Sequence, residues 1–360
     1  MTKALSKAAA GSPLTAPPDP DYVALDLTYR CNLACSFCFM SKSRGKAAGG
    51  GELTLAELKK LVDSLSQRPR EFYLAGGEPS LRRDLPGLVL HIKKRGHRCL
   101  LTTNAQLLDE RAAARLLRAG ADEITVSLHG TPELHDRITG VKGAAARAER
   151  FFRFAAASPL KKNTNLTLWC TINRLNHARL YEVYRYFKTL NPACIAFSQM
   201  DYITKNDLAK TRAIFRAGLG AETVLRSSES LAAGISPAAL ARETALIKAA
   251  GDPSVRFDLD LSPEEMRGWY SPRSDFKKRG FCLAQWKGLW IGPRGEVITC
   301  QPLGHEMGSV RAQPALEVFN GPGFKKFRAA LLKSGGYLPT CSRCGRTSYT
   351  SVPSKERAGR

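Results

Sequence analysis

The stretch Cys31-Asn-Leu-Ala-Cys35-Ser-Phe-Cys38 follows shortly after the apolar segment Tyr22-Val-Ala-Leu-Asp-Leu27. A loop of this length can turn three sulfurs toward one point, so three thiolates at this spacing can bind three irons of a 4Fe-4S cluster. The fourth iron then has no protein ligand and can bind another molecule, much as a catalytic zinc keeps one open position. A zinc site is the alternative on spacing alone. The stretch predicts a metal centre after a strand and leaves the metal open.

The chain starts Met-Thr-Lys-Ala-Leu-Ser, without the apolar core of a signal peptide, and no later stretch approaches the ~20 apolar residues of a membrane helix. We therefore expect a cytoplasmic protein. Thiols stay reduced in the cytosol, where cysteine clusters more often bind metal or do redox chemistry than form disulfides.

A second motif, Gly76-Gly77-Glu78-Pro79, ends the apolar run that begins at Glu71. Glycines permit a close approach of the backbone to a ligand, and a carboxylate can bind an ammonium group. Together with the three upstream cysteines, this motif resembles the radical S-adenosylmethionine superfamily. The resemblance implies that the open iron is chelated by the amino and carboxylate groups of the methionine part of S-adenosylmethionine. It also implies that the Gly-Gly-Glu segment holds the amino group.

Apolar strand-like runs alternate with helical patterns as far as residue 200, which favours parallel βα units. Thr54 and Glu57 have the spacing of a capping box at the start of the first helix. Strands are expected at 22–27, 71–75, 98–102, 123–127, 165–171 and 194–198. Helices are expected at 55–65, 84–95, 109–119, 144–156 and 178–190. This order predicts an α/β fold, a partial (β/α)6 TIM-like barrel.

Polar residues follow the expected strands, where the βα loops of such barrels bind ligands. By the resemblance, Phe37 would contact the adenine, and Thr171 and Asn173 would border the adenosyl group. Ordinary turn chemistry is the alternative for the loops after the third and fifth strands, because Asn and Thr favour turns. The predicted cofactor-binding residues are Phe37, Gly76, Gly77, Glu78, Pro79, Thr103, Asn104, Ser127, Arg137, Thr171 and Asn173.

Ser127 and the Thr103-Asn104 turn would, by the same resemblance, lie near the ribose or the carboxylate of the cofactor. Arg137 would reach the carboxylate, and a surface helix position is its alternative. His129 is the catalytic candidate, because it stands at a strand end beside a glycine. A hydrogen-bonded loop histidine is the alternative for His129 and is the more frequent case.

Four further cysteines lie near the other end of the chain: Cys282, Cys300, Cys341 and Cys344. The sequence between the first two reads as a β-hairpin with a Gly-Pro-Arg-Gly turn, which returns these two cysteines to one end. The arrangement resembles the twitch domain, the shortened form of the SPASM domain that follows many radical S-adenosylmethionine barrels. Since four ligands suffice for one cubane, it implies a single auxiliary 4Fe-4S cluster bound by all four cysteines. A structural zinc site with four cysteines is the alternative.

The connecting segment shows helical patterns near 206–217 and 237–250 and a strand-like run at 255–261, but no motif. The cysteines inside strand-like runs are expected in the core; they are Cys99, Cys170 and Cys194. The predicted organisation is a disordered start at 1–20, the barrel at 21–200, a connecting or substrate-cavity segment at 201–281, a small α+β auxiliary-cluster domain at 282–350 and a basic tail at 351–360.

The reaction implied by the resemblance is reductive cleavage of S-adenosylmethionine to methionine and a 5'-deoxyadenosyl radical, which takes a hydrogen atom from a substrate carbon. An electron donor such as flavodoxin or ferredoxin would supply the electron. A second cluster can accept the electron of a substrate radical, which favours an oxidoreductase-type enzyme that carries out dehydrogenation or C-S or C-C bond formation. Peptide-modifying members often carry a leader-binding domain, and only 30 residues precede Cys31. We therefore expect a small metabolite or a separately delivered peptide as substrate.

The net charge of +23 is the remaining signal. Positive potential of this size attracts anionic molecules, whether phosphorylated metabolites, acidic peptides or nucleic acid. The sequence has no zinc-knuckle spacing and no aromatic-interleaved RNA motif. A radical S-adenosylmethionine enzyme that modifies RNA is therefore an alternative based on charge alone. A noncatalytic, zinc-dependent nucleic-acid-binding protein is the alternative from another class.

Overall fold

The computed structural model describes residues 20–40, 51–219, 228–274, 276 and 282–345. The predictions for the chain start at 1–20, apart from Pro20, and for the basic tail at 351–360 lie outside the described residues.

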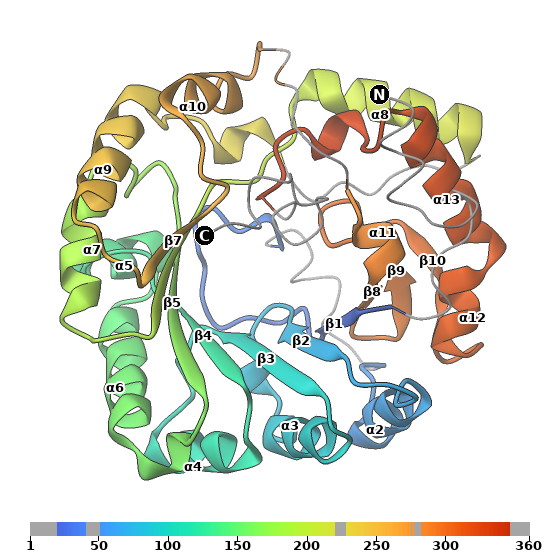
Figure 1. Ribbon diagram of the computed structural model, residues 1–360, viewed down its shortest axis with the longest axis horizontal. Coiled ribbons are helices and arrows are strands. Elements are labelled where there is room, and N and C mark those ends of the chain that lie inside the picture. Colours follow the sequence, from blue (N-terminus) through green and yellow to red (C-terminus); the bar gives the residue numbers. More distant parts are fainter. Residues whose placement is uncertain (1–19, 41–50, 220–227, 275, 277–281, 346–360) are drawn as a thin grey trace.

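A single ten-stranded sheet runs through the described part of the chain, in the order β10-β9-β8-β1-β2-β3-β4-β5-β6-β7 (Figure 1). Neighbouring strands from β1 to β7 are parallel, which confirms the predicted α/β fold with a partial barrel. The strands are β1 Tyr22–Asp26, β2 Glu71–Ala75, β3 Arg98–Thr103, β4 Glu123–Ser127, β5 Asn165–Thr171, β6 Cys194–Ser198, β7 Val255–Asp258, β8 Gly288–Ile291, β9 Glu296–Ile298 and β10 Glu306–Ser309.

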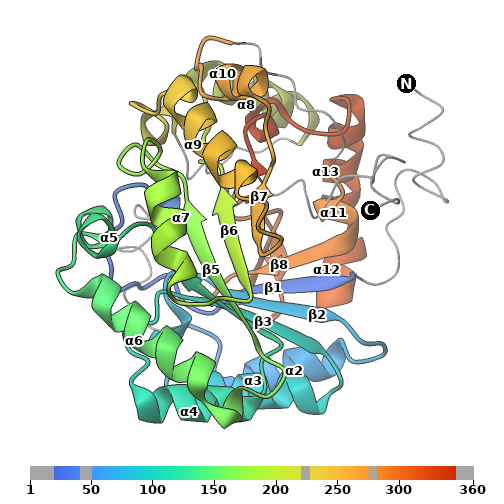
Figure 2. The same ribbon diagram turned by 60° about the vertical axis from the view of Figure 1, so that its left-hand side comes forward.

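The helices of the barrel lie along the outer side of the curved sheet (Figure 2). The five predicted barrel helices, α2, α3, α4, α6 and α7, are confirmed to within two residues at either end. The described helices are α2 Leu55–Ser64, α3 Leu85–Lys94, α4 Glu110–Ala119, α5 Pro132–Thr139, α6 Ala144–Ala157, α7 Leu180–Lys188, α8 Lys205–Gly218, α9 Pro237–Ala249, α10 Pro263–Trp269, α11 Ala284–Lys287, α12 Ala315–Asn320 and α13 Pro322–Lys333.

Local signals explain where these helices begin. Thr54 accepts a hydrogen bond from the backbone of Glu57, whose carboxylate accepts one from the backbone of Thr54, so the predicted capping box is present. Helices α5 and α10 were not predicted. They have eight and seven residues, and about two turns are too few for an apolar periodicity to be recognised.

Along strands such as β1 and β2, every second side chain is apolar and faces the helices, so the core lies between the sheet and the helices. Val23 and Leu25 of β1, and Phe72 and Leu74 of β2, are at most 1% exposed and belong to one large apolar cluster with residues of α2 and α3. Burial of this apolar surface stabilises the barrel by about 25 cal/mol for each Å² removed from water. The residues between them on each strand point to the opposite face of the sheet.

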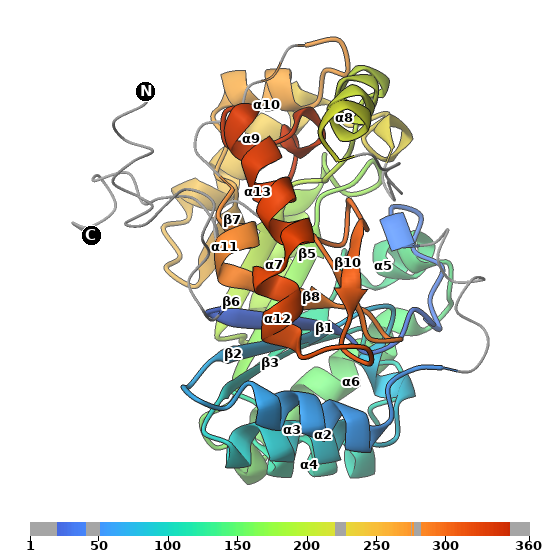
Figure 3. The same ribbon diagram turned by 90° about the vertical axis from the view of Figure 1, so that its right-hand side faces the viewer.

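The C-terminal strands extend the barrel sheet. β8 pairs in parallel with β1, from Tyr22 opposite Gly288 to Leu25 opposite Ile291. β8 and β9 form the predicted hairpin, with Gly295 at a φ of 88° in its turn. Helices α12 and α13 lie beside this hairpin (Figure 3). At the other end of the sheet, the connecting segment contributes β7 as a seventh parallel strand.

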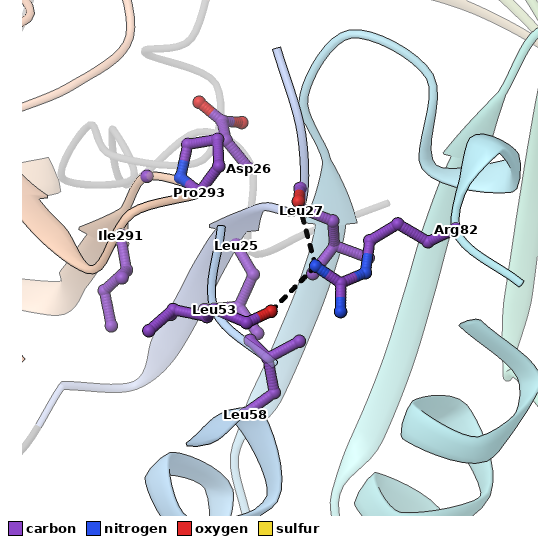
Figure 4. A pocket seen from close by; sticks show the side chains of 9 residues that line it. Leu25, Asp26, Leu27, Leu53, Leu58, Arg82, Ile291 and Pro293 are labelled. Carbon is purple, nitrogen blue, oxygen red and sulfur yellow. Dashed lines mark hydrogen bonds between the residues drawn. The ribbon is translucent and has the colours of Figure 1, made fainter. Parts of the chain in front are cut away.

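A small pocket lies at the seam between β1 and β8 (Figure 4). Its wall is mostly apolar and includes Leu25, Leu53, Leu58 and Ile291. Arg82 donates from Nη1 to the carbonyl oxygens of Leu53 at 2.8 Å and Leu27 at 3.5 Å. The guanidinium thereby ties the segment after β2 to the end of β1.

No helix in the described part of the chain is long and apolar enough to span a bilayer.

Candidate active site

The first cysteine group occupies the loop that leaves the carboxyl end of β1. The loop is fastened to the end of α5, because the backbone N–H groups of Ala34 and Ser36 donate to the carbonyls of Thr139 at 2.9 Å and Ile138 at 3.0 Å. Cys31, Cys35 and Cys38 are each half-buried, and none of the three is part of a disulfide. Three partly accessible thiols on one short loop are a suitable donor set for a cluster that must also meet a small molecule.

Gly76 and Gly77 dock the loop after β2 onto the start of the cysteine loop. The N–H of Gly77 donates to the carbonyl of Thr28 at 2.7 Å. A Cβ on Gly76 would lie 2.4 Å from that carbonyl oxygen, and a Cβ on Gly77 would lie 2.1 Å from the carbonyl oxygen of Arg30. Gly76 also has a φ of 121°, which side chains disfavour. The two glycines are therefore required for contact between two backbone segments.

Glu78 is buried, and protein donors already occupy its carboxylate. Oε1 accepts from the N–H of Ser80 at 2.9 Å and from the hydroxyl of Thr103 at 2.6 Å, and Oε2 accepts from the N–H of Asn104 at 2.7 Å. Burial raises the pKa of Glu78, and these hydrogen bonds act in the opposite direction. The contacts assign the carboxylate to joining the ends of β2 and β3. Pro79, which is buried, follows as the first residue of a 3-10 turn.

The turn after β3 reaches the cysteine loop. The side-chain amide of Asn104 donates to Oδ1 of Asn32 at 2.9 Å and to the sulfur of Cys31 at 3.8 Å. Thr103 and Asn104 were predicted to lie beside the cofactor, and the structure brings Asn104 to the cysteine loop itself.

His129 is buried at the end of β4 and hydrogen-bonded to its surroundings. Its Nδ1 accepts from the N–H of Thr171 at 3.2 Å, so the ring proton is on Nε2. Its ring packs edge-on against Phe37, with centroids 4.8 Å apart. Burial, together with the charge of His135, holds the pKa of His129 well below its usual range. A neutral histidine whose Nδ1 accepts a hydrogen bond matches the alternative given for His129 from the sequence, a hydrogen-bonded loop histidine, rather than a catalytic residue.

The other predicted cofactor residues differ in what their side chains do. Asn173 donates to the carbonyl of Thr171 at 3.0 Å and accepts from the N–H of Leu175 at 3.0 Å, which is strand-end turn chemistry. Arg137 is exposed in the last turn of α5. Ser127 ends β4 beside Trp169 of β5, and its side chain is half-buried.

The second cysteine group is electrostatically coupled. Burial raises the pKa of Cys341 well above its usual value, and the nearby thiols of Cys282, Cys300 and Cys344 raise it further. The N–H of Cys282 donates to the carbonyl of Gly336 at 3.1 Å, which joins the start of this region to the segment before Cys341. When ionised, the four thiolates would repel one another unless a bound cation lies between them. Four cysteine ligands are the number that one 4Fe-4S cluster binds.

Within the described ranges, no three His, Cys, Asp or Glu side chains are close enough to hold a single metal ion. A 4Fe-4S cluster binds each cysteine through a different iron, so its ligands stand further apart than those of one zinc ion, whose sulfurs lie about 2.3 Å from a common centre.

A buried ion pair anchors the C-terminal cysteine pair to the connecting segment. Arg343 donates from Nη1 to Asp207 of α8 at 3.0 Å, and the hydroxyl of Ser342 donates to the same carboxylate oxygen at 3.1 Å. Arg343 is 1% exposed, so loss of either charge would leave the other buried and unpaired. The sequence did not predict this pair, because a single Asp in one helix and a distant Arg between two cysteines form no recognisable motif.

The inner face of the sheet carries polar and aromatic side chains. The hydroxyl of Tyr73 lies 3.0 Å from that of Thr102, and the hydroxyl of Thr167 donates to Glu123 at 2.9 Å. On β7, the guanidinium of Arg256 lies 5.9 Å from the ring centroid of Trp169. These residues were not predicted, although alternation along the strands of a barrel is the signal that marks them.

Two protein-family models match the segments of the chain that contain the two cysteine groups. Residues 25–185 match the family model of the radical SAM superfamily, and residues 282–345 match that of the SPASM iron-sulfur cluster-binding domain. The PqqA peptide cyclase of Granulibacter bethesdensis is 25% identical over 331 residues, which cover 89% of this chain and 78% of that protein. The Fe-coproporphyrin III synthase of Methanosarcina barkeri is 33% identical over 147 residues, 41% of this chain and only 36% of that protein.

The fold also resembles that of SuiB from Streptococcus suis in its complex with the precursor peptide SuiA, with a TM-score of 0.62 and 13% identity over 92% of this chain and 72% of that one. Fold, cysteine groups and matches together define an iron-sulfur enzyme that uses S-adenosylmethionine. The chain carries a radical SAM superfamily domain at residues 25–185 and a C-terminal SPASM-type iron-sulfur domain at residues 282–345. Its cofactors are therefore S-adenosylmethionine with a 4Fe-4S cluster, and an auxiliary cluster, which the two thiol sets fit.

We expect the variant His129→Gln to cleave S-adenosylmethionine within about tenfold of the wild-type rate, because a general base contributes more, typically 10²–10⁴-fold. The pKa of the His129 imidazole lies well below its ordinary value of 6.5, so the ring stays neutral above pH 6.5. Replacing His129 should therefore leave the pH profile of the reaction above pH 6.5 unchanged. The measurement is the rate of 5'-deoxyadenosine release against pH. Disappearance of an ionisation step from that profile would restore His129 as a catalytic base.

Proposed function

We propose that this chain is an oxidoreductase-type radical SAM enzyme that forms a C-C or C-S bond in a peptide. The observation that carries the proposal is the alignment with a PqqA peptide cyclase through both the barrel and the SPASM region, over 89% of the chain. The shared fold with SuiB, which binds a precursor peptide, supports the same substrate class. The match to Fe-coproporphyrin III synthase covers 41% of the chain and carries less weight.

The proposed cofactor site consists of three loops at the carboxyl ends of β1, β2 and β3. Cys31, Cys35 and Cys38 would bind the first cluster, which when reduced supplies the electron that cleaves S-adenosylmethionine into methionine and a hydrogen-abstracting deoxyadenosyl radical. The backbone of Gly76 and Gly77 would face the methionine amino group. Glu78 would set the position of this loop through its hydrogen bonds to the β3 turn.

The remaining predicted residues would surround the adenosyl part. Phe37, held by its edge contact with His129, would supply an apolar surface for the adenine. Ser127 and Thr171 end adjacent strands and would lie beside the ribose. Arg137, which is exposed in the last turn of α5, would bind the carboxylate of the cofactor.

The substrate would meet the inner face of the sheet. A cross-link between two carbons removes two hydrogen atoms from the peptide. One leaves in 5'-deoxyadenosine, and the other leaves as a proton, released to solvent, and an electron. The auxiliary cluster at Cys282, Cys300, Cys341 and Cys344 would accept that electron. An acidic one-electron carrier such as flavodoxin or ferredoxin would reduce the first cluster and suit a chain of net charge +23. Reduced cytoplasmic conditions would keep the seven thiols available for the clusters.

The proposal is tested with the reconstituted protein, S-adenosylmethionine, dithionite and short peptides encoded beside its gene. We expect equal amounts of 5'-deoxyadenosine and of a peptide lighter by one pair of hydrogen atoms, measured by chromatography and mass spectrometry. Tandem mass spectrometry should show missing fragment ions between the two joined residues. Deoxyadenosine release without any change in peptide mass, together with conversion of a small metabolite, would contradict the proposed substrate class.

A further inference from the structure

The amide of Asn104 is directed at a predicted cluster ligand. Its Nδ2 lies 3.8 Å from the sulfur of Cys31, within hydrogen-bonding distance for sulfur. The backbone N–H of Leu33 approaches the same sulfur at 3.5 Å. Asn104 is 7% exposed and Cys31 is half-buried, so the contact is partly shielded from water, which strengthens an N–H to sulfur interaction.

The surrounding turn fixes the orientation of this amide. The N–H of Gln106 donates to Oδ1 of Asn104 at 3.0 Å, so the amide nitrogen must be the atom that faces Cys31. Ala105, the next residue, has a φ of 59°, a left-handed conformation that costs free energy in a non-glycine residue. Glu78 holds the turn in place through the N–H of Asn104 and the hydroxyl of Thr103. The hydrogen bonds at Oδ1 and at Nδ2, the latter to Oδ1 of Asn32 at 2.9 Å, leave the second N–H of the amide directed at the sulfur of Cys31.

We propose that Asn104 is a positioning residue that sets the reduction potential of the first cluster through its hydrogen bond to Cys31; this inference rests on the proposed function. Hydrogen bonds to cluster sulfurs withdraw electron density from them and stabilise the reduced cluster, which carries more negative charge. The role differs from a contact with the ribose or carboxylate, because it acts in the absence of S-adenosylmethionine. The carboxylate of Glu78 acts on the cluster through Asn104.

The experiment is a potentiometric titration followed by electron paramagnetic resonance on reconstituted full-length protein without S-adenosylmethionine. A later addition of S-adenosylmethionine identifies the signal of the first cluster, since only that cluster has an open iron. We expect Asn104→Ala to lower the equilibrium constant for reduction about tenfold, which corresponds to a midpoint potential lower by about 59 mV for one electron. Asn104→Asp, of nearly the same shape, should lower it further, because a carboxylate replaces the donor.

Asn176→Ala is the matched control. Asn176 is also a buried asparagine after a strand, and its amide contacts the sulfur of Cys170 at 3.5 Å, a core cysteine outside both predicted cluster sites. Its loss should leave the midpoint potential of the first cluster unchanged. Wild-type potentials in both Asn104 variants, with normal iron content, would overturn the inference and leave the proposed function intact. Absence of a redox-active cluster in the wild-type protein would instead refute the proposed function.

Discussion

Replacing Cys35 with alanine is expected to remove about four of about eight irons per chain and to abolish release of 5'-deoxyadenosine. A cubane held by three cysteines has no spare protein ligand, so loss of one leaves two irons without protein coordination. The chain can then no longer present an open iron to S-adenosylmethionine. Iron and sulfide analysis of the reconstituted protein, and chromatography of the reaction with dithionite, measure both effects.

Cys194→Ala is the control for this experiment. Cys194 is half-buried like Cys35, but it lies at the start of β6, far from the β1 loop in sequence and outside both predicted cluster sites. It should keep the full iron content and the wild-type rate of cofactor cleavage. Zinc in place of iron in the wild-type protein, or unchanged cleavage by Cys35→Ala, would contradict the assignment of the first cysteine group.

Replacing Cys344 with alanine should also remove about four irons, but it should leave cofactor cleavage in place. In the proposed assignment the first cluster is bound by the separate loop after β1, so it would keep its three ligands. Without the auxiliary cluster the electron of the peptide radical would have no acceptor, so 5'-deoxyadenosine should form without the cross-linked product. The measurements are iron content, the resonance signal of each cluster, and the ratio of deoxyadenosine to product.

Asp207→Asn provides a second variant that keeps all seven cysteines. It removes the charge that pairs with buried Arg343 between Cys341 and Cys344, so it should weaken the auxiliary site without touching a ligand. We expect partial loss of iron from that site only. If Cys344→Ala retains the full iron content, the four C-terminal cysteines do not hold a common cluster.

Local sequence was enough for the barrel because its signals act over short distances. Alternating strands and helices, the Thr54 capping box and the Gly-Pro-Arg-Gly turn each depend on neighbouring residues, and each is present in the structure. The three-cysteine loop and the Gly-Gly-Glu-Pro motif are likewise contiguous. Family and cofactor class followed from these segments and agree with the matched family models.

The class of chemistry can thus be read from the sequence, because short motifs have the residue types and the spacing that suit two iron-sulfur clusters. Tertiary structure alone decided what several of those residues do. It turned the Glu78 carboxylate onto the β3 turn, placed Asn104 against Cys31, buried His129 as a neutral contact of Phe37, and paired Asp207 with Arg343 across 136 residues. These roles depend on which side chains come into contact, and for residues distant in sequence those contacts form only when the sheet has closed and brought its strand ends together.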